Sequence, residues 1–128
     1  MPHSTNYHST LITVAKDCPV GEATPPDRAG SVACLQYEML RDAPYSLTSD
    51  ELLLAVDRAR FGDVDATAWA AKPRACLRAS PLVKRHGFGL HHDAEGRVAL
   101  VPMGSEAYTR LMSDPDVRKR PGMRNRRA

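Results

Sequence analysis

Apolar residues recur along the chain with two different periods, and these periods predict a mixture of strands and helices. Residues 10–15, TLITVA, are rich in β-branched side chains and predict a strand. Residues 88–101 hold two apolar runs separated by the turn sequence DAEG at 93–96. This arrangement predicts a β-hairpin in which Gly96 takes a positive φ.

The strongest local signal is the sequence TSDE at residues 48–51, which has the form of a capping box. Leu47 before it and Leu52 after it suit a hydrophobic staple, and Gly62 suits the end of a helix that runs to about Phe61. Weaker apolar spacing and capping residues predict helices over 31–41, 66–71 and 105–113, a short strand over 75–77 and a single helical turn over 82–86.

These elements predict a small α+β domain rather than a doubly wound fold, because strict βαβ alternation is missing. We expect an antiparallel sheet of three or four strands, including the hairpin at 88–101, packed against three main helices. A three-helix bundle with a β-ribbon is the alternative. Residues 1–117 are expected to form the single domain, with 1–9 loose and 118–128 a basic, disordered tail.

Composition agrees with a globular protein in a reducing compartment. Apolar residues make up 42% of the 128 residues and charged residues 26%. No apolar run is long enough to span a membrane, and residues 1–10 lack the apolar core of a secretory signal. The chain has three cysteines, an odd and small set that favours free thiols. We therefore expect a cytoplasmic protein that does not contact membranes.

Positive charge is concentrated at the end of the chain. The net charge is +3, while residues 118–128 alone hold six basic residues and no acid. A basic tail of this kind can hold nucleic acid or another polyanion without sequence preference. A frayed terminus that carries no function is the simpler interpretation.

A second basic segment predicts a candidate anion site. Residues 66–92 hold five basic residues and no acid. Ser80-Pro81 predicts a helix start, whose free N–H groups could bind a phosphate or carboxylate beside the Arg78 guanidinium. In the alternative, Ser80 only caps a helix. The candidate ligand-binding residues are Arg78, Ser80, Lys84, Arg85, His86 and His91.

No motif narrows the identity of the anion. The chain lacks a glycine-rich phosphate loop and a dinucleotide-binding fingerprint, so no cofactor is expected. Aromatic residues make up only 5% of the chain, which argues against a stacking platform for bases. A phosphorylated small molecule and a nucleic acid backbone both suit the charge.

Several long blocks resemble a small uncharacterised bacterial family. The blocks are TNY at residues 5–7, ITVAKDCP at 12–19, QYEML at 36–40, PYSLTSDE at 44–51, CLRASPLVKRHGFGLH at 76–91 and EGRVAL at 95–100. The similarity extends over about residues 5–113 and leaves out the tail after Asp116. The resemblance implies a free-standing bacterial cytosolic protein, and it implies no activity, cofactor or catalytic residue.

Histidines and cysteines offer weaker hypotheses. His91 and His92, with Cys76, His86 or Cys18, could form a zinc site, but the paired ligand spacing of such sites is absent. Neighbouring residues of a strand also point to opposite faces. We therefore expect no metal.

Cys76 with His86 or His91 could instead form a thiolate–imidazole pair in a small enzyme. A buried, unreactive Cys76 is the simpler interpretation. The sequence leaves open whether the protein is an enzyme.

Three functions therefore compete: a module that binds an anion through residues 78–91, a small enzyme using Cys76 or a histidine, and an accessory protein that oligomerises through an exposed helix face. A concave pocket lined by the candidate residues would favour a ligand or a reaction. A basic face continuous with the tail would favour nucleic acid, and an exposed apolar stripe would favour oligomerisation.

Overall fold

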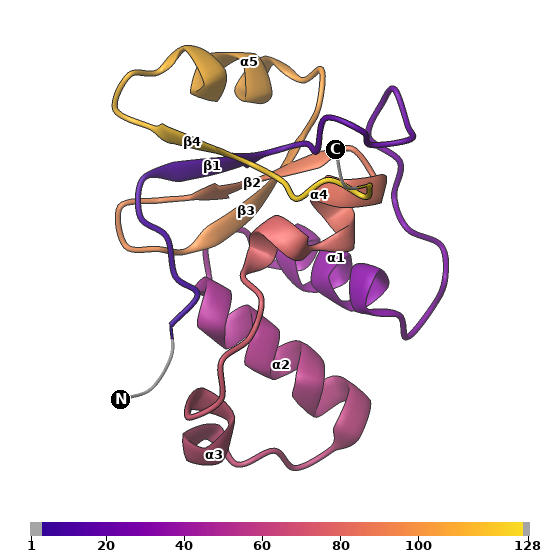
Figure 1. The fold of residues 1–128 in the computed structure, drawn as a ribbon, viewed down its shortest axis with the longest axis vertical. Coiled ribbons are helices and arrows are strands. Elements are labelled where there is room, and N and C mark those ends of the chain that lie inside the picture. The colour runs from indigo at the N-terminus through magenta and orange to yellow at the C-terminus, as the bar shows by residue number, and fades with distance from the viewer. Residues whose placement is uncertain (1–3, 127–128) are drawn as a thin grey trace.

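The computed structural model describes residues 4–126 and contains one sheet with helices on both faces (Figure 1). The elements follow in the order β1 (Thr10–Thr13), α1 (Val32–Asp42), α2 (Ser49–Phe61), α3 (Ala66–Ala70), the 3₁₀ turn η1 (Leu77–Ala79), α4 (Pro81–Arg85), β2 (Phe88–His92), β3 (Val98–Pro102), α5 (Glu106–Ser113) and β4 (Arg118–Pro121). None of these helices is both long and apolar enough to cross a membrane.

The sheet has the strand order β3-β2-β1-β4. β2 pairs antiparallel with both β1 and β3, whereas β4 lies parallel to β1. The predicted α+β class and the hairpin are confirmed, and Gly96 takes a φ of +83° in the hairpin turn. The three-helix bundle with a β-ribbon is wrong, because a four-stranded sheet organises the core.

Alternating side chains of β1 divide the core into two parts. Ile12 packs with Leu90, Leu40 and Leu52 on the face covered by α1, α2 and α4. Leu11 points to the other face, where it packs in a smaller cluster under α5. Figure 1 shows α5 on the opposite side of the sheet from α1 and α2. The same alternation decides which face each residue of β2 and β4 occupies.

The predicted helix starts are confirmed in atomic detail. The Thr48 hydroxyl accepts a hydrogen bond from the Glu51 N–H, and the Glu51 carboxylate accepts one from the Thr48 N–H. Ser31 and Ser105 cap α1 and α5. These signals are local, since each cap and its partner lie within one helical turn.

The strand predicted over residues 75–77 is absent. The chain instead turns through η1, where the Ala79 N–H donates to the Cys76 carbonyl, and continues into α4. In this turn Leu77 enters the larger core and is 1% exposed.

The segment predicted to be a disordered tail forms a strand. Arg118–Pro121 occupies the free edge of β1, and the Gly122 N–H then donates to the Thr13 carbonyl. Two interactions hold the strand there. Its backbone forms hydrogen bonds with the edge of β1, which would otherwise be unpaired, and the preceding Val117 is buried in the smaller core. Residues 127–128 lie outside the described part of the chain.

The start of the chain is also docked rather than loose. The Thr5 N–H and hydroxyl both donate to the Asp50 carboxylate, and the side-chain Oδ1 of Asn6 accepts from the Asp50 N–H. Residues 4–9 are therefore tied to the first turn of α2, where a side chain can satisfy free N–H groups. Residues 1–3 lie outside the described part.

Candidate functional site

The six residues predicted to form an anion site do not gather at one place. Ser80 is buried, and its hydroxyl donates to Gln36 Oε1 at 2.6 Å while accepting from the Leu82 N–H. It thus caps α4 and joins two helices. Because α4 has only five residues and its first turn is already capped, it offers no open anion site.

The remaining members of the set lie in different surroundings. Arg85 and His86 line a pocket together with Asp27, and the His86 imidazole bonds to the Thr24 carbonyl. Lys84 is half-buried, and its carbonyl accepts from the Asn125 side chain.

His91 lies on the face of the sheet opposite α4. It pairs with Leu11, which packs under α5, and its Nδ1 lies 2.8 Å from the Tyr45 hydroxyl. Burial lowers the pKa of His91.

Arg78 instead lies in a cationic pocket that includes residues from both ends of the chain. The pocket has a volume of about 300 Å³ and is lined by Lys16, Arg78, Pro121, Gly122, Met123 and Arg124. No carboxylate is among these lining residues. None of the three cations forms an ion pair with a residue of the described chain. We call it the Arg78 pocket.

Backbone contacts hold the C-terminal segment against Arg78. The Met123 N–H donates to the Arg78 carbonyl at 2.7 Å, and Arg78 Nε donates to the Pro121 carbonyl at 2.7 Å. Gly122 allows this close approach, because a Cβ there would lie 2.9 Å from a Val83 methyl and 3.0 Å from the Thr13 carbonyl oxygen. The guanidinium is thereby oriented while its two terminal amino groups remain available.

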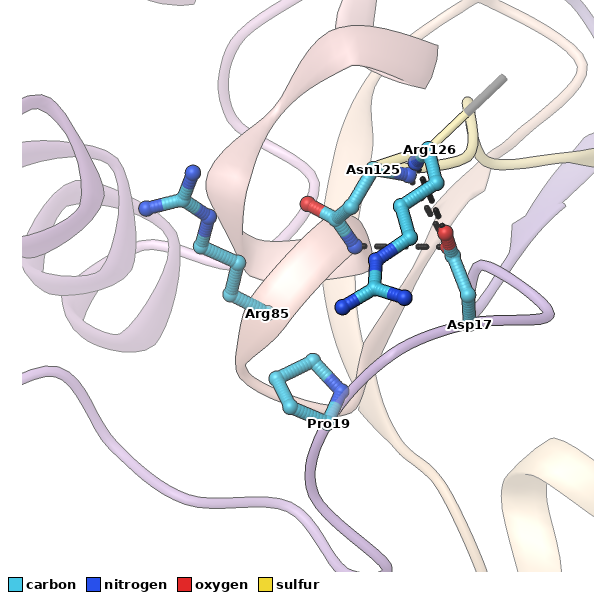
Figure 2. A pocket seen from close by; sticks show the side chains of 5 residues that line it. All are labelled: Asp17, Pro19, Arg85, Asn125 and Arg126. Atoms are coloured by element: carbon cyan, nitrogen blue, oxygen red, sulfur yellow. Dashed lines mark hydrogen bonds between the residues drawn. The ribbon is translucent and has the colours of Figure 1, made fainter.

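A larger neighbouring pocket, of about 540 Å³, is less suited to an anion because Asp17 lines it. Figure 2 shows the Asp17 carboxylate bonded to the backbone of Asn125 and Arg126, while the Arg85 side chain extends away from them. The hydrogen bond from the Asn125 N–H is the main reason that the pKa of Asp17 lies below its usual value. Asp17 therefore fastens the segment that carries Arg124.

A thiol and a phenol meet beside the Arg78 pocket. The Tyr7 hydroxyl lies 3.1 Å from Cys76 Sγ, and both side chains are half-buried. Burial raises the pKa of Tyr7, and the bond to Cys76 adds to this effect. Arg78 and Arg120 act in the opposite direction, so both cations lie near the pair. The partner of Cys76 is thus a tyrosine, not the histidine that the enzyme hypothesis assumed.

His92 is the one residue among those described that has a buried side-chain nitrogen or oxygen without a hydrogen-bond partner. Its Nδ1 bonds to the Leu90 carbonyl, while Nε2 is unpaired and the residue is fully buried. Burial lowers the pKa of His92 to about 4, which keeps the ring neutral at pH 7. Its ring packs edge-to-face with that of Tyr7, with centroids 5.5 Å apart and the planes at 72°.

The described residues were also compared with the geometry that a bound metal ion requires. Within residues 4–126, no group of three His, Cys, Asp or Glu side chains is placed to hold a metal ion. Cys34 is buried, and Cys18 and Cys76 are half-buried free thiols.

Sequence reasoning selected Arg78 but missed Lys16 and Arg124 as its neighbours. Lys16 follows β1 and Arg124 follows β4, so the parallel pairing of these strands brings them together. The excess of basic residues after position 117 was the available signal, but it did not indicate where that segment docks.

The chain matches a protein family whose function is unknown. The model of a family described as "Family of unknown function (DUF6157)" matches residues 2–128. No curated protein and no solved structure matches the chain. The match includes residues 114–128, so the expectation that the tail lies outside the family is wrong.

Proposed function

The chain belongs to the family of unknown function DUF6157, and we propose that it is a binding module for an anionic ligand. One observation carries the proposal: Lys16, Arg78 and Arg124 line a single pocket that has no carboxylate among its lining residues. Cations gathered in this way repel one another, and a bound anion would relieve the repulsion. The pocket therefore has a physical reason to bind negative charge.

The chemistry of the pocket favours a phosphate group. A guanidinium can form two parallel hydrogen bonds with phosphate or carboxylate oxygens, and Arg78 is already oriented by its bond to Pro121. Lys16 and Arg124 can neutralise the additional charge that a phosphate carries. A volume of about 300 Å³ suits a small group rather than a large aromatic ligand.

Binding of pyrophosphate, measured by calorimetry at low salt, tests the proposal. Arg124→Gln is the informative variant, because Arg124 forms no side-chain hydrogen bond or ion pair within the described chain. We expect at least tenfold weaker binding by this variant. Arg60→Gln, which removes an exposed charge on α2, is the matched control and should bind like the unaltered protein. Equal affinity of both variants, or no binding by the unaltered protein, would overturn the proposal.

A small enzyme that uses Cys76 is the second candidate function, and the Tyr7–Cys76 bond beside Arg78 favours it. Reactive cysteines are commonly at least partly exposed and lie beside positively charged side chains. If Cys76 is the nucleophile, iodoacetamide at neutral pH should alkylate it several times faster than Cys18, which is also half-buried. A rate equal to or below that of Cys18 would remove this candidate.

A further inference from the structure

We propose that the partner of this chain is a nucleic acid, bound through its phosphates along a strip of cations beside β4. The strip consists of Arg118, Arg120, Arg78, Lys16 and Arg124, and we call it the β4 strip. The inference rests on the proposed function, because the last three residues form the Arg78 pocket. The proposed function concerns one anionic group, whereas this inference concerns a polymer that carries a phosphate at every repeat.

The first support is the arrangement of cations on β4. Arg118 and Arg120 pair with Thr10 and Ile12 of β1, so both point to the same face of the sheet. They line a pocket of about 430 Å³ with Asn6, Tyr7, His8, Ser9 and Thr10, and no carboxylate is among these residues. Residues two apart on a strand lie roughly 6.6 Å from each other. This row of cations suits a polymer whose charges also repeat.

The second support is the continuity between this pocket and the Arg78 pocket. Tyr7 lines the pocket of Arg118 and Arg120, and its hydroxyl contacts Cys76, two residues from Arg78. Arg78 and Arg120 both favour the ionised form of that hydroxyl, as cations close to it must. The Tyr7 hydroxyl therefore lies near a cation of each pocket, Arg120 of one and Arg78 of the other. The cations of the two pockets then add to one positive potential.

Protection of an exposed sheet edge does not account for the whole strip. Charged residues and proline on an edge strand prevent pairing with other chains, and β4 has both. Lys16 and Arg78, however, lie outside β4, and so does Arg124. Positively charged residues from three other segments thus lie beside β4, and protection of the edge strand does not require them.

The strip fits a phosphate backbone better than it fits bases or a membrane. Four of its five cations are arginines, whose planar guanidinium matches phosphate oxygens. Tyr7 already packs against His92, and Met123 is the one large apolar residue at the strip that is more than a third exposed. The strip thus lacks an aromatic platform for stacking and a group of apolar residues for insertion into lipid. We expect binding without sequence preference.

Fluorescence anisotropy with a labelled oligothymidylate tests the inference. The variant Arg118→Gln/Arg120→Gln is compared with Arg60→Gln/Arg110→Gln, which has the same net charge but loses exposed arginines from α2 and α5. We expect the first variant to bind at least tenfold more weakly than the second. The slope of log affinity against log salt should fall by about 1.4 in magnitude, because two phosphate contacts are lost.

Pyrophosphate separates failure of this inference from failure of the proposed function. Both double variants should still bind pyrophosphate, with a much smaller loss than Arg124→Gln, because neither changes a residue that lines the Arg78 pocket. If pyrophosphate binds but the two double variants bind the oligonucleotide equally, the nucleic acid inference fails and the proposed function stands. If vesicles of anionic lipid bind and the oligonucleotide does not, the inference is also overturned. If pyrophosphate does not bind, the proposed function fails as well.

Discussion

Ser80 takes its role from a partner far away in the sequence. Its hydroxyl donates to Gln36, 44 residues earlier, and both side chains are buried. Sequence reasoning could recognise the capping signal at Ser80, because the capped N–H lies two residues away. It could not foresee Gln36, and for that reason Ser80 remained among the candidate ligands.

Replacement of Ser80 by alanine tests this structural role. We expect Ser80→Ala to lower the free energy of unfolding by about 1–3 kcal/mol, because it leaves Gln36 Oε1 buried without a donor and uncaps α4. Urea denaturation measures the loss. Pyrophosphate affinity of the folded variant should be unchanged, and a drop in that affinity would return Ser80 to the binding site.

His92 makes a pH-dependent contribution to stability. Its pKa is about 4 in the folded protein and about 6.5 for an unperturbed histidine, so the unfolded chain binds the proton more readily. The free energy of unfolding therefore falls as the pH decreases from 6.5 toward 4. At pH 4 the titration of His92 has lowered it by about 3 kcal/mol.

His92→Leu should remove this contribution. At pH 7 the variant should be at least as stable as the unaltered protein, because leucine has no unpaired buried nitrogen. The difference in urea midpoint between the two proteins should grow in favour of the variant as the pH falls from 6.5 to 4. A constant difference over that range would mean that His92 does not titrate in this way.

At the scale of elements, the C-terminal segment depends on one carboxylate. Asp17 accepts hydrogen bonds from the backbone N–H groups of Asn125 and Arg126, and from the Asn125 side chain. Because these bonds lower its pKa, Asp17 stays ionised at neutral pH. The contact stabilises the folded chain fully at pH values above the usual carboxyl pKa. This stabilisation is lost as the pH falls through the lower pKa that Asp17 has in the folded chain.

Loss of this carboxylate should release the segment without unfolding the sheet. In Asp17→Ala we expect trypsin to cleave after Arg124 several times faster than in the unaltered protein, since the backbone there loses its acceptor. Mass spectrometry of the early products measures the rate. Asp42→Ala, which removes an exposed carboxylate paired with Arg41, is the control. Equal rates for the two variants would show that Asp17 does not hold the segment.

Elements with local signals were predictable, and β4 was not. The capping box of α2 and the turn of the β2–β3 hairpin are encoded within a few residues. The β4 sequence, RKRP, has no apolar alternation and resembles a solvated tail. Its strand state comes from the unpaired edge of β1, about a hundred residues earlier, and from the burial of Val117. Such long-range pairing leaves no pattern in the segment itself.

At the scale of the molecule, the two ends of the chain complete one sheet. A chain that stops at Val117 loses the ladder between β1 and β4 and, in addition, the main-chain hydrogen bonds from the Arg118, Gly122 and Met123 N–H groups. At about 1 kcal/mol for each of the last three bonds alone, we expect the free energy of unfolding to fall by at least about 3 kcal/mol. Urea denaturation of this shortened chain measures the change. Stability equal to that of the full chain would mean that β4 adds charge only.

The candidate site follows from the same long-range pairing. The acid-free stretch at 66–92 drew attention to Arg78, but its other cations and histidines lie on several surfaces. Composition gives the sign of a segment's charge, whereas the fold decides which charges share a surface. Lys16 and Arg124 join Arg78 only after β4 has docked beside β1.

The parallel contact between β1 and β4 means that the sheet can be completed only at the end of synthesis. Thr10 is made early, whereas its partner Arg118 follows about a hundred residues later. Until β4 has been synthesised, the edge of β1 that faces away from β2 lacks its partner strand. This edge belongs to a strand that contains the apolar residues Leu11 and Ile12. Translation that stalls before residue 118 would leave that edge available to other unfinished chains.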